Sequence, residues 1–279
     1  MCEGIAVELC GIQLGDERRK QRSYQILAAL AANPEASINA SCEGWSESIA
    51  AYRFFNNASV TPEQILQPHR EATQRRLLEQ PVVLIVQDTT ELDFTKHPPQ
   101  DAPCLNVPDR FGLYEQVQLA VTPDKLFLGV VGAEFFDRAP ETLGKADERS
   151  SLPIEQQESF RWLQGSCELA AECPQTQIVS VADREADIYD IFVEAQQQSG
   201  PRADWIIRAR VDRCTPECDL ASGPAVYGKV REEVSPSALR ATIQRFSKWV
   251  KPRMPSGRFL TSTRQPGRCS ANQAYSAWL

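Results

Sequence analysis

The sequence of 279 residues contains no apolar run close to the roughly 20 residues that a membrane-spanning helix requires. Its first residues, MCEGIAVELCG, include Glu3 and Glu8 and lack the basic segment with which a secretory signal peptide begins. The nine cysteines have no regular spacing and their number is odd, so reduced thiols are expected rather than a disulfide framework. These absences predict a cytoplasmic protein, and the 42% of hydrophobic residues is typical of a globular chain.

Acidic residues are absent from the C-terminal part of the chain. All 37 Asp and Glu lie in residues 1–233, whereas residues 234–279 hold eight Lys and Arg and no acid. The net charge of −7 argues against a protein that coats nucleic acid over its whole surface, but a local basic face can still contact phosphates. Turn-forming residues replace regular patterns after Asp212, so residues 214–279 are predicted to form an irregular basic tail.

The N-terminal quarter of the chain carries signals for helices. Asp16 is predicted to cap one helix and Ser46 a second. The segment Thr61-Pro62-Glu63-Gln64 has the pattern of a capping box with proline at the first helical position. Pro68 is expected to kink or divide the helix that follows. An all-helical unit over residues 1–75 is therefore predicted.

From Pro81 onward the pattern favours strands. Val82 to Val86 form a continuous apolar run, as in a central strand that is covered on both faces. The predicted order is strand, hairpin, helix, strand, helix and strand, over residues 82–86, 115–136, 154–173, 177–182, 188–195 and 205–210. This order is typical of an α/β domain with a mixed sheet and flanking helices, here over residues 76–213.

Two of the apolar runs lead into aspartates. PVVLIVQDTTELDF (81–94) contains Asp88, and IVSVADREADIYD (178–190) contains Asp183. Ligands of α/β sheets gather at the carboxyl ends of strands, so both side chains are predicted to meet at one edge of the sheet. Facing carboxylates suit Mg²⁺ or Mn²⁺, and two such ions about 4 Å apart assist phosphodiester displacement. The simpler interpretation is that Asp88 caps a turn and Asp183 caps the following helix.

Both acidic segments resemble the first and second acidic motifs of the IS-four family of DDE transposases, which includes the Tn-five transposase. The segments LGDERRKQR, SINASCEGWSESIAAYRFFNN and VTPEQIL are similar to the helical DNA-binding domain of that family. ESFRWL and DWIIRARVDR also fit their expected places, so the resemblance covers about residues 6–213. It implies an RNase H-like sheet on which Asp88 and Asp183 are the catalytic carboxylates that hold Mg²⁺ or Mn²⁺.

The resemblance further implies contacts with double-stranded DNA, at the terminal inverted repeats of a transposon. The implied contact residues lie in the first helix, in the second matched block and after the last strand: Arg18, Arg19 and Arg22, then Arg53, then Arg208, Arg210 and Arg213. Arg208 and Arg210 are expected to point to the same side, as alternate residues of a strand do. A solvated surface is the simpler interpretation of all these arginines. The family also implies a homodimer in a synaptic complex and association with the nucleoid.

The third carboxylate of the family has no counterpart in this chain. The resemblance stops near Arg213, and the last acid, Glu233, does not stand in the family's Tyr-Arg-Glu-Lys arrangement. The acid-free tail is typical of translation out of frame or of a fusion to unrelated sequence. We therefore expect a truncated, catalytically deficient DDE transposase. The alternatives are a DNA-binding remnant that inhibits full-length transposase and a metal-dependent nuclease without strand transfer.

Overall fold

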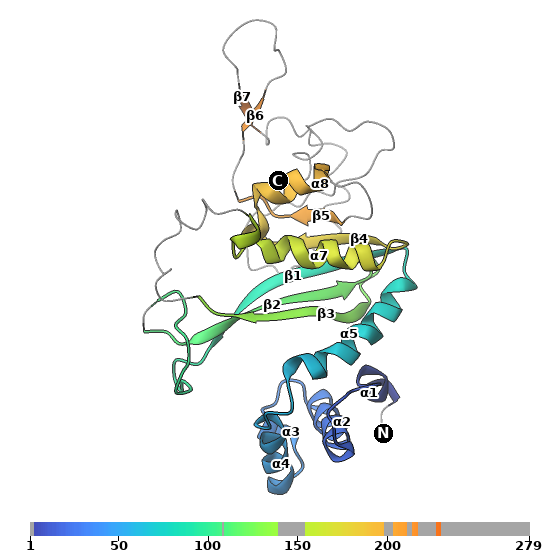
Figure 1. The fold of residues 1–279 in the computed structure, drawn as a ribbon, viewed down its shortest axis with the longest axis vertical. Coiled ribbons are helices and arrows are strands. Elements are labelled where there is room, and N and C mark those ends of the chain that lie inside the picture. The colour runs from blue at the N-terminus through green and yellow to red at the C-terminus, as the bar shows by residue number, and fades with distance from the viewer. Residues whose placement is uncertain are drawn as a thin grey trace, which may run out of the picture. The chain divides into compact units, whose positions relative to one another are not determined.

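The computed structural model of the protein describes residues 3–107, 109–138, 154–197, 203–210, 214–216 and 227–229 (Figure 1). The chain divides into two compact units. The first comprises Met1–Glu79 together with Leu128–Val131, and the second comprises Gln80–Phe127 and Gly132–Leu279. The first unit combines helices with a short piece of one strand, Leu128–Val131, and the second contains the rest of the main β-sheet.

The N-terminal segment is helical, as its sequence predicts, but it forms five helices rather than the three predicted to start at Asp16, Ser46 and Thr61. They are α1 (Glu3–Glu8), α2 (Glu17–Ala32), α3 (Ile38–Ser41), α4 (Trp45–Phe55) and α5 (Pro62–Leu78). Their apolar faces meet in one core, whose buried members are Leu9, Ile12, Leu14, Ile26, Ala51 and Phe54. Tyr24, Leu27 and Leu30 of α2 pack against this core, so the helical spacing of apolar residues in the sequence does identify the inward face of α2.

The helix starts follow the capping rules, with one exception. The Asp16 carboxylate accepts a hydrogen bond from the Arg18 amide at 2.8 Å and begins α2. Both hydrogen bonds of the capping box between Thr61 and Gln64 are present at the start of α5. The prediction that Ser46 caps a helix is wrong, because α4 begins one residue earlier, after Gly44.

Helix α5 continues through Pro68, so of the predicted kink or division of this helix the division is wrong. Proline lacks the N–H that would have donated a hydrogen bond, and its ring crowds the carbonyl four residues earlier. The Pro68 ring is buried, and Ala72, Thr73 and Leu77 are buried further along the same helix. Packing of this inward face keeps the helix continuous in spite of the missing hydrogen bond.

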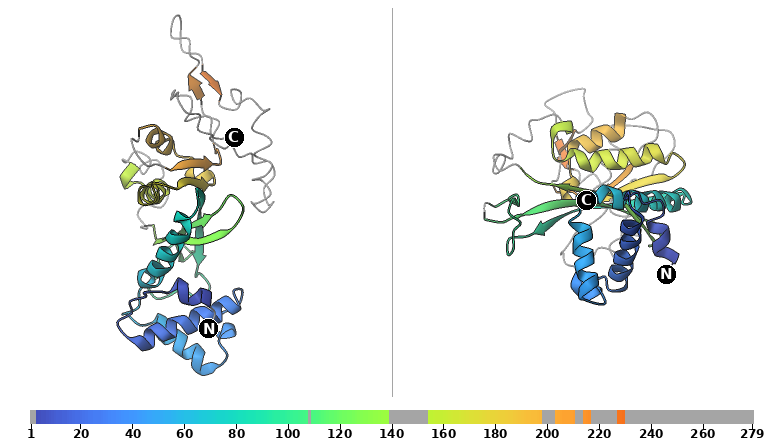
Figure 2. Two further views of the ribbon diagram at one scale, coloured as in Figure 1. Left: turned by 90° about the vertical axis from the view of Figure 1, so that its right-hand side faces the viewer. Right: turned by 60° about the horizontal axis from the view of Figure 1, so that its bottom comes forward.

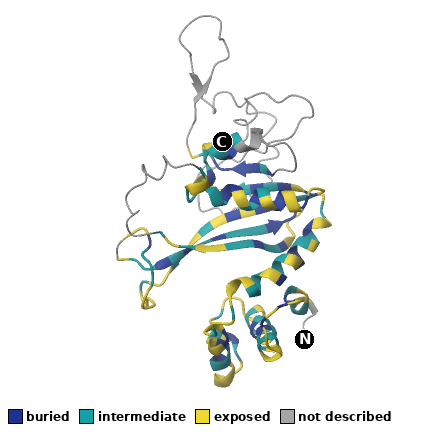
Figure 3. Cartoon of the chain, viewed as in Figure 1, coloured by how far each residue is buried: buried dark blue, intermediate teal, exposed yellow. Residues whose placement is uncertain are grey.

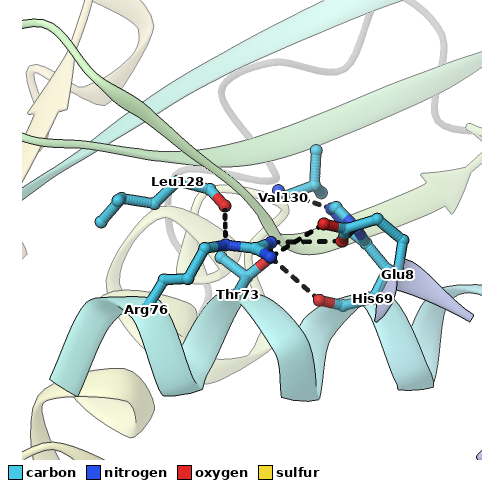
Figure 4. A network of polar contacts seen from close by, with 6 residues as sticks. All are labelled: Glu8, His69, Thr73, Arg76, Leu128 and Val130. Carbon is cyan, nitrogen blue, oxygen red and sulfur yellow. Dashed lines mark hydrogen bonds and ion pairs between the residues drawn. The ribbon is translucent and has the colours of Figure 1, made fainter. Parts of the chain in front are cut away.

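A network of charged and polar groups joins α1 and α5 to Leu128–Val131 within the first unit (Figure 4). The Glu8 carboxylate accepts hydrogen bonds from Arg76 Nη1 at 2.8 Å and lies 2.6 Å from His69 Nδ1. Arg76 Nε donates to the Leu128 carbonyl at 2.7 Å, and the Val130 amide donates to His69 Nε2 at 2.9 Å. Since Nε2 accepts, Nδ1 is the nitrogen that carries the proton toward Glu8.

The second unit contains a five-stranded mixed sheet in the order β3-β2-β1-β4-β5. Its strands are β1 (Val82–Asp93), β2 (Gly112–Val121), β3 (Phe127–Phe136), β4 (Gln177–Ala182) and β5 (Asp204–Ile207). β1 and β2 are antiparallel, whereas β4 is parallel to both β1 and β5. The predicted hairpin is confirmed, and its turn includes a hydrogen bond from the Lys125 amide to the Thr122 carbonyl at 2.9 Å.

Two strands differ in extent from their predictions. β1 continues to Asp93, so Asp88 lies within the strand rather than at its exit. The extension is stabilised by antiparallel pairing with β2, which continues as far as Asp93 and Gly112. β5 ends at Ile207, so Arg208 and Arg210 follow the strand and the alternation expected of them does not apply.

In the described part of the second unit, the helices lie on one face of the sheet (Figures 1 and 2). They are α7 (Phe160–Glu172) and α8 (Tyr189–Gln197), with short 3₁₀ turns η2 (Ile154–Gln156) and η3 (Arg184–Ala186). The single helix predicted over residues 154–173 is thus divided into a 3₁₀ turn and α7. Both the strands and α7 contain buried residues, which are coloured dark blue in Figure 3.

Two further short strands lie in the segment that was predicted to be irregular. β6 (Cys214–Pro216) and β7 (Tyr227–Lys229) pair in an antiparallel sheet of their own. The other residues of the predicted tail lie outside the described part of the chain. Among the described residues, none of the helices has the length and apolar character needed to cross a membrane.

Candidate functional site

The two predicted aspartates occupy matching positions on neighbouring parallel strands. The pairing of β1 with β4 ends at Val86 opposite Val181. Asp88 and Asp183 each follow two residues later, at the carboxyl end of this pairing. The topology therefore brings both carboxylates to one edge of the parallel part of the sheet, where α/β proteins generally bind ligands.

Backbone hydrogen bonds orient each carboxylate. Asp88 Oδ1 accepts from the Thr89 amide at 3.0 Å, and Asp183 Oδ1 accepts from the Glu185 amide at 2.8 Å. Asp183 is the N-cap of η3, so the simpler interpretation of this residue as a cap also holds. A carboxylate has about four acceptor positions, so one capping bond is compatible with binding a cation as well.

The charges of this edge act on one another. Partial burial raises the pKa of Asp88 above its ordinary value of 3.8, and the negative charge of Asp183 raises it further, against a lowering by the Thr89 hydrogen bond. Burial likewise raises the pKa of Glu185, followed by the charges of Asp183 and Asp88. All three residues are exposed at their surfaces, so burial here means that neighbouring protein displaces part of the water around each carboxyl. The sequence alone assigned no role to Glu185.

A cationic side chain stands near this acidic edge. Arg138 donates from Nε to Glu158 at 2.8 Å, and its guanidinium carbon lies 4.2 Å from the centre of the Tyr114 ring. The charge of Arg138 opposes the rise in the pKa of Glu185. No sequence pattern indicates this arrangement, because Tyr114, Arg138 and Glu158 are far apart in the chain.

The donor chemistry of the acidic edge fits a hard divalent cation in part. Carboxylate oxygens are the ligands that Mg²⁺ and Mn²⁺ prefer, and the raised pKa of Asp88 indicates negative charge that a cation would neutralise. In the described ranges, however, no group of three or more His, Cys, Asp or Glu side chains is arranged to hold a metal. The two aspartates are thus a plausible but small ligand set.

Of the three arginines predicted to follow the last strand, the structure describes Arg208 and Arg210, and these two have different surroundings. Arg208 is only 9% exposed, and its amide donates to the Ala182 carbonyl of β4 at 3.1 Å. Arg210 is exposed, and its amide donates to Asp187 at 2.6 Å. Arg213 lies outside the described residues. A surface contact with DNA is therefore available to Arg210 but not to Arg208 in this conformation.

The three arginines of α2 have two different surroundings. Arg18 is exposed and Arg22 half-buried, and their spacing of four residues places them on the same side of the helix. Arg19 points toward the preceding loop, where its Nη1 donates to the Leu14 carbonyl at 2.8 Å. Arg19 therefore holds the loop before α2, whereas Arg18 and Arg22 face solvent and can contact phosphates.

Helix α4 presents a second exposed surface in the first unit. Arg53 is exposed, Tyr52 is 44% exposed, and Trp45 is 80% exposed. The spacing of these residues places them on one side of the helix, opposite the buried Ala51 and Phe54. Aromatic rings beside an arginine can contact nucleic acid, although such rings can equally remain solvated.

Residues 1–60 match the family model described as transposase DNA-binding. This range includes Arg18, Arg19, Arg22 and Arg53. It holds five basic and seven acidic residues, so its net charge is negative and any phosphate contact must come from a local basic surface. The match supports a transposase or DNA-binding role for the chain, and the N-terminal domain is of the DNA-binding type.

Proposed function

We propose that this chain is a DDE-type transposase of the IS-four family that binds transposon ends and carries an incomplete catalytic core. The observation that carries the proposal is the match of residues 1–60 to a transposase DNA-binding domain. In this domain Arg18 and Arg22 share an outward side of α2. The start of α2 is the only part of the domain's sequence in which basic residues cluster. Such a cluster supplies phosphate contacts even on a chain of negative net charge.

The second unit supports the catalytic half of the proposal. An RNase H-like sheet with the order β3-β2-β1-β4-β5 would carry its acids where β1 and β4 end their pairing, which is where Asp88 and Asp183 lie. These two residues would hold Mg²⁺ or Mn²⁺, and a bound divalent ion supplies charge stabilisation for phosphodiester displacement. The chain's own contribution is the orientation of the two carboxylates by the Thr89 and Glu185 amides.

Two other functions use the same features. An inhibitor of full-length transposase would need the DNA-binding domain and no catalysis, which fits an acid pair without a third ligand. A metal-dependent nuclease would need the acid pair but no specificity for transposon ends. The DNA-binding match favours the first of these over the second.

The test is a gel-shift titration of the full chain with a duplex that carries the terminal inverted repeats flanking its gene, at fixed salt. A shuffled duplex of equal length and composition serves as the control. We expect the repeat to bind at least about 10³-fold more tightly, the usual lower bound for specific over non-specific binding. Equal affinities for the two duplexes would contradict the assignment to a transposase.

A further inference from the structure

Four buried polar side chains and the half-buried Gln118 form a hydrogen-bonded cluster between the sheet and α7. Gln87 is 2% exposed, and its Nε2 donates to Ser180 Oγ at 2.7 Å and to Ser166 Oγ at 2.8 Å. Its Oε1 accepts from Gln116 Nε2 at 3.2 Å and from Gln118 Nε2 at 3.4 Å. One amide thus joins β1 to β2, to β4 and to α7. Burial of so many polar groups is unfavourable unless each is hydrogen-bonded, so the cluster requires an explanation.

The position of Gln87 along β1 indicates what the cluster does. The backbone pairing of β1 with β4 ends at Val86 and Val181. Beyond this point β1 pairs only with β2, and β4 continues toward β5 through the hydrogen bond from the Arg208 amide to the Ala182 carbonyl. Gln87 is the first residue after the last pair, so its bond to Ser180 links β1 and β4 where the two strands part.

Gln87 and Asp88 point to opposite faces of the strand because side chains alternate along it. The amide of Gln87 is therefore inside the layer with α7, while the carboxylate of Asp88 is on the other side. A shift of the Gln87 side chain would move the backbone that carries Asp88. On β4, Ser180 is paired with Ile85 of β1 and lies three residues before Asp183.

We propose that Gln87 is a positioning residue, whose amide fixes the separation of Asp88 and Asp183 by tying β1 to Ser180 of β4. This inference rests on the proposed function, in which the two aspartates act together on one cation. In the same network Ser166 ties Gln87 to α7, which carries neither aspartate. The two serines therefore offer the same hydroxyl group to Gln87, but only the bond to Ser180 links the two strands that lead to the aspartates.

This difference supplies a matched pair of variants. Ser166→Ala and Ser180→Ala each delete one hydroxyl from a side chain that is 0% exposed, and each removes one hydrogen bond to the same nitrogen. Urea unfolding should show similar losses of stability for both. Gln87→Leu, which removes both strand links, is a third variant. Asp88→Asn reports whether cation binding involves the acid pair at all.

Two measurements on the full chain separate positioning from general stability. The first is the dissociation constant for Mn²⁺, followed by electron paramagnetic resonance. Ser180→Ala should weaken Mn²⁺ binding about tenfold, at the lower end of the effect of groups that orient metal ligands, and Ser166→Ala should leave it unchanged. The second is hydrogen exchange of the Thr89 and Glu185 amides, which bond to the two aspartates and should exchange faster in Ser180→Ala alone.

Each outcome decides the proposal. Selective effects of Ser180→Ala on both measurements support it, and equal effects of the two serine variants overturn it, because the network would then only stabilise the fold. If Mn²⁺ binding is the same in the wild type and in Asp88→Asn, the proposed cation site fails. In that case hydrogen exchange alone decides whether Gln87 positions the strand ends: faster exchange confined to Ser180→Ala supports positioning, and any other pattern refutes it.

Discussion

At the scale of single residues, the three arginines of α2 show that neighbours in a motif can have different tasks. Arg19 donates to the Leu14 carbonyl, whereas Arg18 lies exposed on the side of α2 that it shares with Arg22. We expect Arg18→Ala combined with Arg22→Ala to weaken DNA binding and to reduce the slope of log affinity against log salt by about 2, about one unit for each lost phosphate contact. Gel shifts at several salt concentrations measure this slope.

Two controls make this prediction specific. Arg75→Ala removes an exposed arginine of the same unit outside the matched range, and it should leave the slope unchanged. Arg19→Ala should lower the melting temperature but have little effect on the slope of log affinity against log salt, since it removes a hydrogen bond that holds the loop before α2. A slope that depends only on the number of arginines removed, and not on which ones, would contradict the distinction.

The raised pKa values of Asp88 and Glu185 predict that these acids destabilise the fold at neutral pH. The folded state binds the protons of these two carboxyls more tightly than the unfolded state does. The stability that the bound protons contribute is present below the ordinary pKa values of 3.8 and 4.5, and it is lost as the pH rises through the raised pKa values. Asp88→Asn and Glu185→Gln should therefore raise the melting temperature at pH 7. The expected increase is about 1–2 °C, since the groups are exposed.

Calorimetry at pH 7 and pH 3 checks this sign. The gain in melting temperature should disappear at pH 3, where the wild-type carboxyls are themselves protonated. Asp101→Asn, at another exposed position, serves as the control and should change little at either pH. A loss of stability in Asp88→Asn at pH 7 would mean that the carboxylate is held by favourable contacts rather than strained by its neighbours.

Glu8 predicts the opposite pH dependence. Burial alone would raise its pKa, but the hydrogen bonds from Arg76 and His69 and their charges outweigh burial and lower the pKa below 4.5. The stability contributed by Glu8 is thus present above pH 4.5 and is lost as the pH falls through the lowered pKa. Glu8→Gln should cost about 1–2 kcal/mol of unfolding free energy at pH 7, as for hydrogen bonds between charged groups.

Urea unfolding at pH 7 and at pH 3.5 would measure this contribution. The difference between Glu8→Gln and the wild type should shrink at the lower pH. Glu35→Gln, an exposed position in the same unit, is the matched control and should have no effect larger than about 0.5 kcal/mol. An equal cost for both substitutions would show that the network around Glu8 is not responsible.

At the scale of elements, Gly165 in the middle of α7 decides how the helix approaches the sheet. A Cβ atom at this position would overlap the side-chain amide of Gln118, and a Cβ at Gly132 of β3 would lie 2.8 Å from Gln118 Oε1. The two glycines thus leave room for one amide between helix and strand. Without this contact, alanine at position 165 would favour the helix by about 1 kcal/mol.

We therefore expect the effect of Gly165→Ala to change sign with the residue at position 118. In the wild type it should cost up to about 1 kcal/mol, because the Gln118 amide, at the far end of a flexible side chain, must leave its place beside Gln87. In a Gln118→Ala background, the same substitution should stabilise the chain. Urea unfolding of the four proteins in this cycle gives the coupling energy. A cost that is equal in both backgrounds would show that Gly165 matters for another reason.

The elements show what the sequence can predict and what it cannot. Caps at Asp16 and Thr61 depend on nearby residues, so their helices could be located from local patterns. The continuation of β1 to Asp93 depends on pairing with β2, and the end of β5 at Ile207 depends on its partner β4. These partner strands lie far along the chain, so no local sequence pattern indicates where the pairing, and hence the strand, ends.

The candidate site shows the same division. The apolar runs before Asp88 and Asp183 predicted an acid pair at one edge of a sheet, and the register of β1 and β4 gives the matching positions. The proximity of Glu185 and Arg138, the burial of Arg208 and the link between Gln87 and Ser180 arise from tertiary packing. They could not be predicted from spacing alone.

At the scale of the whole molecule, the proposed function makes separate demands on this chain for DNA binding and for DNA cleavage. Residues 1–60 match a transposase DNA-binding domain, and we propose that the basic surface of α2 in this domain contacts the DNA. Cleavage requires enough oxygen ligands to complete the near-octahedral shell that Mg²⁺ demands. Asp88 and Asp183 supply two carboxylates, and the sequence contains no acid after Glu233.

We predict that the purified 279-residue chain binds transposon ends but does not cleave them. Positioned charges act on the transition state, so a missing ligand should reduce the rate by about 10³-fold or more rather than by a small factor. The measurement is strand cleavage of a donor plasmid bearing the terminal repeats, with Mg²⁺ or Mn²⁺, beside a gel shift on the same ends. Cleavage that is lost in Asp183→Ala would contradict the prediction and show that a third ligand exists. Glu185→Gln would then be the first variant to examine, because Glu185 is the acid whose pKa responds to both Asp88 and Asp183.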